Sequence, residues 1–321
     1  MQPIVSIITT SYNKEKYIGA TIRSVIGQSY LHWELIIIDD FSTDQSVEVI
    51  SSFLTDTRIT LIKNERNRGA NCSRNSGIKT AKGKYILFLD ADDVLAPFCL
   101  EKRVLKTIEN PNAGFYVFAM HVFFKNIGDD KRKWVPVSIH TLKDFLQHKL
   151  PWGITQLLWD INFLKRVGGF NENMHRLQDV ELHTRALMQS NIKYFLYPTI
   201  TDCYYRIDEE RKTYKEYAFM KCLTDSAVMY CNEFEKQVNK YMVKYLYGTV
   251  FQISLSLIQN FKRRNINRSE YGELQQLLLS YTLYSRSGVF KKIIFKTALF
   301  YNLYLIRVPG INKIISIIVV L

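Results

Sequence analysis

The segment KYILFLDADD, residues 84–93, decides how the fold of this chain is predicted. Residues 85–89 form an uninterrupted apolar run, which is typical of a strand whose two faces are both buried. The run ends at three carboxylates, Asp90, Asp92 and Asp93. Charges of one sign repel at this spacing, and partial burial adds a desolvation cost to each. A cation or a proton is therefore expected among them.

Short apolar runs and helical patterns alternate on the N-terminal side of this segment. Strands are predicted at 4–10, 34–39, 58–63 and 84–90, and helices at 14–28, 42–54 and 70–81. Ser42 or Thr43 is expected to cap the second helix. Short turns between alternating strands and helices predict an α/β protein with a doubly wound, Rossmann-like sheet. Such sheets bind ligands beyond the carboxyl ends of their strands.

The pattern changes after about residue 113. A long aromatic strand is expected there, then a helix at 177–190, an extended segment at 192–206 and a mostly helical, basic region from 211. We therefore expect a domain at 1–210, with a nucleotide-binding half at 1–110 and an acceptor half at 111–210, followed by a helical C-terminal region at 211–321.

The chain has 321 residues, of which 47% are apolar and 23% charged, so it is a folded globular protein and not a disordered one. Its net charge of +13 is uneven, because residues 1–210 carry +2 and residues 211–321 carry +11. Nucleic acid or an anionic membrane surface are the partners that such a charge attracts. Lysines and arginines interrupt the apolar segment 289–321, which leaves runs shorter than the ~20 residues that span a bilayer. An interfacial helix is predicted there.

Cysteines and the first residues bear on the compartment. The five cysteines are scattered, without metal-ligand spacing or a dense disulfide pattern, which indicates reduced thiols in the cytosol. The segment MQPIVSIITTSYNKEKY lacks the basic and apolar regions of a signal peptide. We expect a cytoplasmic protein that is peripheral on the inner face of the membrane, with its oligomeric state left open.

Acidic residues at strand ends suggest a cation site. Two carboxylates separated by one residue can converge on Mg²⁺ or Mn²⁺ and leave coordination positions open for phosphate oxygens. The cation then neutralises charge on a leaving diphosphate. The alternative for Asp90 to Asp93 is a solvated, Asp-rich turn.

Two further places point to a nucleotide. Asp39 and Asp40 close the second strand, where a carboxylate can accept hydrogen bonds from a base or ribose, or can instead form a turn. Arg74 stands near the start of a helix, where backbone N–H groups and a guanidinium can both face phosphate. The alternative is a surface arginine.

Taken together, VSIITTSYNKEKYIGATIRSVIGQSYLHWELIIIDDFSTDQS followed by NRGANCSRNSGIKTAKGKYILFLDADD resembles a family 2 glycosyltransferase of the GT-A fold. The resemblance covers about residues 1–205 and is to inverting enzymes of bacterial surface-polysaccharide type. It implies transfer of a hexosyl or N-acetylhexosaminyl group from a nucleotide diphosphate sugar, often UDP-linked. The acceptor it implies is a hydroxyl of a glycan or of a lipid-linked glycan.

The resemblance also implies roles for particular residues. Asp40 would meet the uracil, and Asp92 or Asp93 would hold the Mn²⁺ or Mg²⁺ ion. The nucleotide contacts that it implies are Thr9, Ser11, Tyr12, Glu15, Asp39, Asp40, Arg74 and Asp90.

The family places an acidic pair at the start of a helix across the cleft, and its Asp is the base. In RLQDVEL the pair is Gln178-Asp179, which departs from the common Glu and leaves Asp179 as the general base. Glu181 points nearly opposite on a helix and cannot easily substitute. His175 is a candidate metal or phosphate ligand, with a structural role as the alternative. Trp152 is a candidate for stacking on an acceptor sugar.

Two other classes of protein remain as alternatives. A nucleotidyltransferase would carry a Gly-rich, basic phosphate loop after the first strand, and TTSYNKEKY contains none. A scaffold or nucleic-acid-binding protein with a vestigial site would use the basic C-terminal region. That region mixes its charge with aliphatic runs such as IISIIVVL, which suit lipid better than a phosphodiester backbone. We therefore expect no nucleic acid partner.

Overall fold

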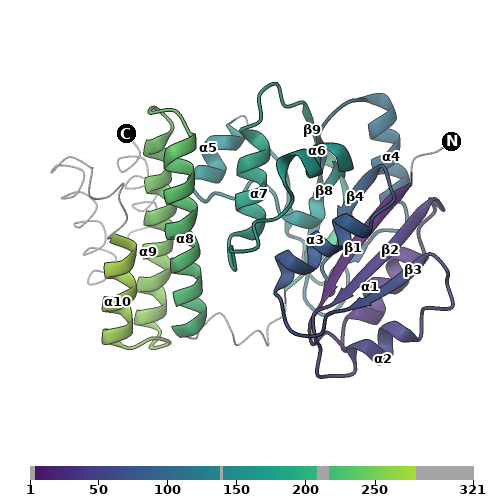
Figure 1. Ribbon diagram of the computed structural model, residues 1–321, viewed down its shortest axis with the longest axis horizontal. Coiled ribbons are helices and arrows are strands. Elements are labelled where there is room, and N and C mark those ends of the chain that lie inside the picture. Colours follow the sequence, from purple (N-terminus) through teal and green to yellow (C-terminus); the bar gives the residue numbers. More distant parts are fainter. Residues whose placement is uncertain (1–3, 138–139, 208–216, 280–321) are drawn as a thin grey trace. The chain divides into compact units, whose positions relative to one another are not determined.

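A computed structural model describes residues 4–137, 140–207 and 217–279 (Figure 1). These residues form two compact units. The first takes residues 4–137, 151–173 and 185–207, and the second takes residues 140–150, 174–184 and 217–279. Within these ranges, none of the helices combines the length and the hydrophobicity that a bilayer-spanning segment needs. The interfacial helix predicted at 289–321 lies outside the described residues.

The first unit contains a mixed sheet, in which the described residues form nine strands. Their order is β3-β2-β1-β4-β8-β6-β9-β5, with β7 paired to β6. The first four strands in this order are parallel, as predicted, and β8 then pairs antiparallel with both β4 and β6. The bounds are β1 Val5–Ser11, β2 Trp33–Asp39, β3 Ile59–Lys63, β4 Tyr85–Phe88, β5 Val94–Leu95, β6 Phe115–Phe123, β7 Lys133–Trp134, β8 Leu157–Asp160 and β9 Tyr194–Arg206.

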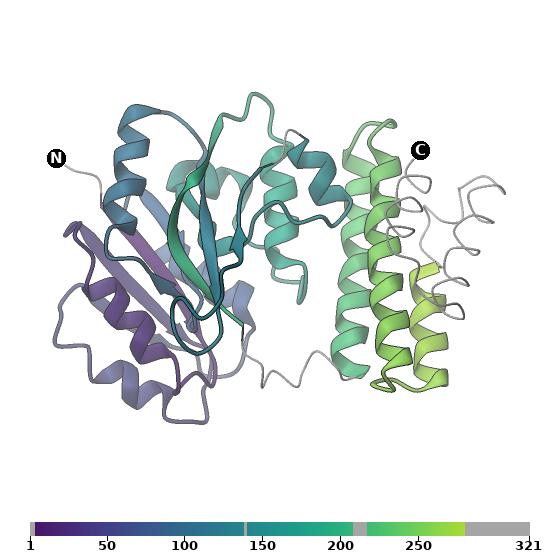
Figure 2. The same cartoon turned by 180° about the vertical axis from the view of Figure 1, so that it is seen from behind.

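Helices cover both faces of the parallel strands. The helices of this unit include α1 Ile18–Ile26, α2 Ser46–Ser51, α3 Ala70–Thr80, α4 Cys99–Glu109 and α6 Ile161–Val167. On one face, Ile22 of α1 belongs to the same apolar cluster as Ile7 of β1. On the other, Gly77 of α3 lies so close to Ile8 and Ile38 that a Cβ atom there would clash. Neighbouring residues of a strand point to opposite faces, so α1 and α3 lie on opposite sides of the sheet (Figure 2). The doubly wound arrangement is confirmed for these strands.

The second predicted helix begins later than its sequence pattern suggests. Asp39 at the end of β2 accepts hydrogen bonds from the backbone N–H of Ser42 (2.9 Å) and from its hydroxyl (2.5 Å). Asp44 binds the N–H of Ser46 in the same way (2.9 Å), and α2 starts at that residue. The prediction that Ser42 or Thr43 caps the helix is therefore wrong, because a carboxylate holds the chain in a turn at Ser42.

The second half of the sheet is built from long aromatic strands. Residues of β6 and β9 pair in parallel, and their rings stack across the two strands. Phe115 lies on Tyr194 with ring centroids 5.0 Å apart, and Phe118 lies on Tyr197 at 5.1 Å. Such cross-strand pairs stabilise a sheet beyond their burial. Strands β6 and β9 belong to the same sheet as the parallel strands, to which β8 connects them.

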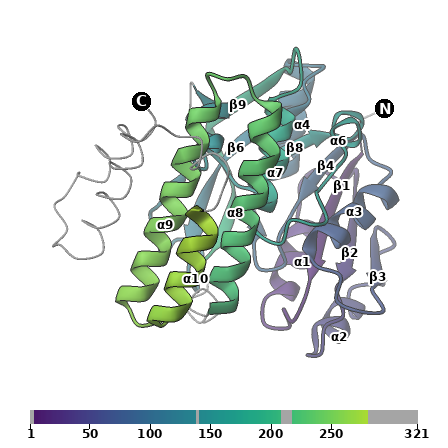
Figure 3. The same cartoon turned by 60° about the vertical axis from the view of Figure 1, so that its left-hand side comes forward.

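The second unit is helical, as predicted for the region after 211. It contains α5 Thr141–Leu146, the first turns of α7 Gln178–Leu187, α8 Tyr217–Gln237, α9 Leu246–Lys262 and α10 Arg268–Leu279. Helices α8, α9 and α10 pack side by side (Figure 3). The Thr249 hydroxyl donates to the Leu146 carbonyl (2.8 Å), and the hydroxyls of Thr184 and Tyr230 share a hydrogen bond (2.8 Å). Two segments from before residue 210 thus belong to this unit, whereas the predicted division was sequential.

Candidate functional site

Polar residues gather at the carboxyl ends of the parallel strands. Ser11, the last residue of β1, is paired in register with Asp39 at the end of β2, and Asp39 is paired with Lys63 at the end of β3. The acidic turn follows β4, and β4 pairs with the side of β1 that faces away from β2. The strand ends that the sequence predicted to converge therefore form one edge of the sheet, where α/β sheets bind ligands.

The acidic turn is held by its own backbone and by α1. The N–H of Asp93 donates to the carbonyl of Asp90 (3.0 Å), which closes the turn. The hydroxyl of Thr21, on α1, donates to the carbonyls of Ala91 (3.0 Å) and Asp93 (2.8 Å). The backbone of the turn is thus fixed, and its three carboxylates leave in different directions.

Two of these carboxylates meet cations of the chain itself. The guanidinium of Arg74 donates to the Asp90 carboxylate (2.9 Å), and the ammonium of Lys14 contacts the carboxylate of Asp92. Asp90 keeps 33% of its side-chain surface exposed, whereas Asp92 keeps only 7%. Arg74 therefore lies in the acidic site, and the alternative of an unrelated surface arginine is wrong. Lys14 was not predicted, because a lysine in a polar loop carries no spacing signal.

The third carboxylate, that of Asp93, is fully buried. It accepts hydrogen bonds from the hydroxyl of Thr155 (2.9 Å) and from the backbone N–H of Arg206 (3.0 Å). Burial first, and then the charges of Asp92 and Asp90, raise the pKa of Asp93 well above its ordinary value. The crowding of charge is thus relieved by two cations and by a raised proton affinity. This environment favours Asp92 over Asp93 as the accessible carboxylate.

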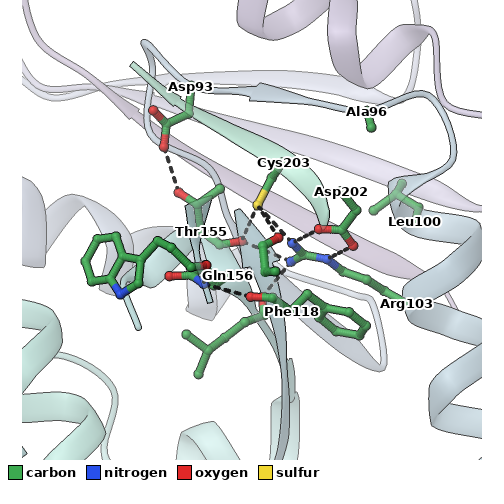
Figure 4. Close-up of polar contacts among 12 residues, drawn as sticks. Asp93, Ala96, Leu100, Arg103, Phe118, Thr155, Gln156, Asp202 and Cys203 are labelled. Carbon is green, nitrogen blue, oxygen red and sulfur yellow. Dashed lines mark hydrogen bonds and ion pairs between the residues drawn. The ribbon is translucent and has the colours of Figure 1, made fainter. Parts of the chain in front are cut away.

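Asp93 is connected to a buried ion pair in the second half of the sheet (Figure 4). Thr155, which binds Asp93, has its carbonyl 3.0 Å from the guanidinium of Arg103. Arg103 comes from α4 and makes a two-pronged contact with Asp202 of β9, at 2.8 and 2.7 Å. All of these side chains are buried, and a two-pronged Arg–carboxylate pair fixes orientation as well as distance. The acidic turn is therefore anchored to α4 and β9, a connection for which the sequence offered no signal.

Arg206 forms a second anchor at the end of β9. Its Nε donates to the carbonyl of Asp92 (3.0 Å), and its guanidinium lies over the rings of Tyr17 (4.7 Å) and Phe123 (4.3 Å). Cation–π contacts of this kind orient a guanidinium without removing its charge. A third cationic side chain thus lies beside the turn.

Asp39 and Asp40 are both used within the protein. Asp39 forms the turn with Ser42, so the turn-forming alternative is correct for this member of the pair. Asp40 accepts hydrogen bonds from the side chain of Asn64 (2.7 Å) and from the backbone N–H groups of Arg68 (2.9 Å) and Gly69 (2.8 Å). Both carboxylates are almost entirely buried. Asp40 therefore shapes the loop before α3, and its contact with uracil stays a prediction.

The end of β1 has both buried and exposed members. Thr9 and Ser11 are buried, and within the part of the chain that the structure describes their hydroxyls have no hydrogen-bond partner. Tyr12 is 47% exposed. Glu15 is exposed, and its carboxylate accepts the N–H of Gln45 (2.9 Å). The unpartnered hydroxyls and the exposed ring suit a ligand at this strand end, but the contacts remain predictions.

Asp179 and His175 belong to the second unit. Asp179 lies in the first turn of α7, where its carboxylate is half-buried and accepts the N–H of Val180 (3.0 Å). His175 is exposed, and its carbonyl accepts from the side chain of Gln178 (3.2 Å). Glu181 is fully buried, which agrees with the expectation that it cannot replace Asp179. The base and ligand roles stay predictions.

Trp152 does not lie on a binding surface. Its side chain is fully buried, with its ring 6.2 Å from Phe115 and 6.3 Å from Tyr194. The prediction that Trp152 stacks on an acceptor sugar is therefore wrong, since no part of the ring reaches solvent. Trp159 lies in β8 and is fully buried as well.

The residues at the turn fit a divalent cation only together with a ligand. In the three described ranges, no group of three or more His, Cys, Asp or Glu side chains is arranged to hold a metal ion. Asp92 and Asp90 supply two carboxylates, which is the number that Mg²⁺ typically takes from a protein when phosphate oxygens complete its shell. The donor set therefore suits a cation bound together with a diphosphate.

The family of the chain follows from comparison with known proteins. Residues 6–170, just over half of the chain, match Glycosyl transferase family 2. The chain belongs to this family.

Two curated relatives each match about a third of the chain. The putative teichuronic acid biosynthesis glycosyltransferase TuaG of Bacillus subtilis (strain 168) is 43% identical over 104 residues, which are 32% of this chain and 41% of that protein. The UDP-Glc:alpha-D-GlcNAc-diphosphoundecaprenol beta-1,3-glucosyltransferase WfgD of Escherichia coli is 42% identical over 107 residues, 33% of this chain and 42% of that protein. In both cases the match spans less than half of the relative's length.

Solved structures extend the likeness to most of the chain. S. aureus TarS 1–349 has a TM-score of 0.59 at 15% identity, covering 87% of this chain and 91% of that one. TarS has also been solved in complex with UDP-GlcNAc. The mannosyltransferase PcManGT of Pyrobaculum calidifontis, in complex with GDP-Man and Mn²⁺, has a TM-score of 0.57 at 17% identity, covering 95% and 88%. These likenesses confirm the GT-A fold.

Proposed function

We propose that this protein transfers a sugar from a UDP-linked donor to a hydroxyl of a glycan or lipid-linked acceptor, with inversion at the anomeric carbon. The observation that carries the proposal is the acidic turn after β4, with Arg74 on Asp90 and Lys14 on Asp92 at the shared edge of four parallel strands. Family membership, the UDP-Glc named for WfgD and the UDP-GlcNAc bound by TarS support the choice of donor.

The acidic turn would serve the leaving group. Asp92, with Asp90 beside it, would hold Mn²⁺ or Mg²⁺, which supplies positive charge to the departing diphosphate. The Mn²⁺ in the PcManGT complex supports this part of the proposal. Arg74 and Arg206 add fixed positive charge next to the turn. These guanidinium groups would stabilise the negative charge of a diphosphate bound there.

Asp179 would serve the acceptor. In a single displacement, the acceptor oxygen forms a bond to the anomeric carbon as the bond from that carbon to the diphosphate oxygen breaks. The proton of the acceptor hydroxyl passes to the carboxylate of Asp179, and the electron pair of the broken bond leaves with the nucleoside diphosphate. The half-buried position of Asp179 at the start of α7 suits a base that has to receive a proton.

The charge of the chain and the names of its relatives support an acceptor class and a cellular location for the proposed reaction. The diphosphoundecaprenol-linked acceptor named for WfgD supports a lipid-linked glycan as the acceptor class. The net charge of +11 on residues 211–321 supports work at an anionic membrane surface on the cytoplasmic side.

The test is a screen of UDP- and GDP-sugars for hydrolysis and for transfer to synthetic GlcNAc-diphospho-lipids, with Mn²⁺ or with a chelator. We expect turnover with one or more UDP-sugars, stimulated by Mn²⁺, and an inverted anomeric configuration in the product. Asp92→Asn is expected to lose the stimulation. Absence of turnover with every sugar nucleotide in the presence of Mn²⁺ and acceptor would contradict the proposal.

A further inference from the structure

Lys14 is fixed in place by its backbone. Its N–H donates to the hydroxyl of Ser46 (2.7 Å), and its carbonyl accepts the N–H groups of Tyr17 and Ile18 (both 2.9 Å). The side chain leaves this fixed point and ends on the carboxylate of Asp92. The backbone of Lys14 is therefore held in place, and its side chain is an ordered part of the acidic turn.

The ion pair formed by Lys14 and Asp92 is largely shielded from water. The Lys14 side chain is 21% exposed and that of Asp92 is 7% exposed. The carbonyl of Asp92 is tied to Arg206 and the following carbonyl to Thr21, so the carboxylate cannot move away with its backbone. A partly buried pair between two fixed backbones is stronger than an ordinary surface pair, because water and salt screen it less.

A divalent cation would need the same carboxylate. The ammonium of Lys14 and a metal ion repel each other, so they cannot share the oxygen that Lys14 contacts. A metal ion on the other oxygen of Asp92 would still lie close to the ammonium and be repelled by it, so metal binding at Asp92 is favoured when the ammonium moves aside. Lysine has a flexible four-carbon stem and donates in any direction, so it can turn from a carboxylate to the oxygens of a bound diphosphate. The diphosphate thus supplies the negative charge that the displaced ammonium needs.

We propose that Lys14 is an internal counter-ion of Asp92 that competes with the divalent cation, so that cation and donor diphosphate bind to this site together. The inference rests on the proposed function and adds a residue and an order of events to it. Without a diphosphate, Lys14 holds Asp92 and the cation binds weakly. With a diphosphate, the ammonium moves to the phosphate oxygens and Asp92 becomes available to the cation.

The test measures Mn²⁺ binding directly, by electron paramagnetic resonance of free Mn²⁺, with and without UDP. We expect Lys14→Met to bind Mn²⁺ in the absence of UDP about tenfold more tightly than the unchanged protein, the factor expected when a charge-assisted hydrogen bond is removed from competition. The enhancement of Mn²⁺ affinity by UDP should shrink by a similar factor. Lys14→Arg keeps the charge and is expected to behave as the unchanged protein does.

Lys16→Met is the matched control, because it removes the same charge from an exposed residue of the same loop. A general electrostatic effect would raise the Mn²⁺ affinity of both methionine variants equally, which would overturn the inference. Equal affinities of Lys14→Met and the unchanged protein would overturn it as well. Thermal unfolding of each variant verifies that the loop change leaves the fold intact.

The inference and the proposed function fail differently. If sugar-nucleotide turnover depends on Mn²⁺ but Lys14→Met leaves Mn²⁺ binding unchanged, only the role of Lys14 is lost. If no variant binds Mn²⁺ with or without UDP, and turnover proceeds unchanged in chelator, the metal-assisted part of the proposed function is wrong. The competition between Lys14 and the cation is then wrong as well.

Discussion

The acidic turn illustrates how three like charges can occupy four consecutive positions. Asp90 is paired with Arg74, Asp92 is paired with Lys14, and burial raises the proton affinity of Asp93. Each solution depends on residues from a different part of the chain. Asp90 and Asp92 are therefore balanced by cations of the chain, and the buried Asp93 is an internal anchor of the turn.

The first prediction about a single residue concerns Asp179. Asp179→Asn removes the proton acceptor and keeps the shape of the side chain, so we expect the turnover number to fall by about 10²–10⁴-fold. Transfer to the acceptor is measured at saturating UDP-sugar. UDP affinity, measured by calorimetry, is expected to stay unchanged because the donor side is untouched. A variant that retains full turnover would remove Asp179 from the base role.

Helices and strands decide where these residues meet. Gly77 allows α3 to lie directly on β1 and β2, which brings the start of α3, and with it Arg74, to the strand ends. The close approach needs a residue without a Cβ atom, since an added Cβ would lie 2.5 Å from Ile8 and 3.1 Å from Ile38. A single glycine therefore connects the packing of the sheet to the geometry of the site.

Gly77→Ala tests this connection. We expect the variant to lose about 1–3 kcal/mol of unfolding free energy, because α3 has to shift to make room for the methyl group. Gly272→Ala in α10 is the matched control, since nothing lies within 4 Å of its Cβ position and alanine has the higher helix propensity. Urea denaturation of both variants measures the difference. Equal midpoints for the two would show that the α3 contact is not tight.

Helix α7 carries a prediction about pH. His183 is buried against the ring of Phe145, with centroids 5.3 Å apart, and burial lowers its pKa to about 3. Unfolding exposes the imidazole, whose pKa then returns to about 6.5, so the unfolded chain takes up a proton that the folded chain refuses. The stability that His183 contributes is thus complete above pH 6.5 and is lost as the pH falls towards 3.

His183→Gln is expected to reduce this loss, because an amide takes up no proton. Below pH 6.5 the unchanged protein should lose up to about 1.4 kcal/mol per pH unit more than the variant. Denaturant unfolding at pH 7.5, 6.0 and 5.0 compares the two slopes. Parallel slopes would mean that burial does not lower the pKa of His183 in the folded state.

The whole molecule is divided by charge. Residues 1–210 are close to neutral, whereas residues 211–321 carry nearly all of the net positive charge. Such a separation lets one part of a chain bind an anionic surface while another part keeps a mixed charge for chemistry. Helices α8 to α10 lie within residues 211–321 but are close to neutral themselves, and the segment 289–321 is the most apolar part of this sequence.

The uneven charge of the whole molecule leads to a prediction about membrane binding. Removal of residues 289–321 is expected to shift the protein from sedimenting with anionic phospholipid vesicles to remaining in the supernatant, because apolar side chains and lysines leave together. Binding to double-stranded DNA at the same salt concentration is the comparison, and we expect it to be the weaker of the two. Vesicle binding that survives the truncation would assign the attachment to another part of the chain.

Much of the fold was predictable because its signals are local. The four parallel strands and the helices α1 and α3 follow from apolar runs and periodic patterns, and the structure has them within a few residues of the predicted bounds. The start of α2 was missed because the Asp39 side chain competes with the helix for the backbone of Ser42. Strand β8 was missed because its apolar run, residues 157–159, is only three residues long, whereas the run at β4 covers residues 85–89.

The class of sheet, the family and the presence of carboxylates and Arg74 at the strand ends could all be predicted from the sequence, since each depends on neighbours along the chain. The partners that those groups meet depend on the tertiary structure. Lys14 reaches Asp92 across 78 positions, Arg206 reaches Asp93 across 113, and Trp152 enters the core although its ring chemistry suits a sugar. Contacts at such separations depend on how strands are ordered in the sheet, and that order is set by packing and not by the local pattern.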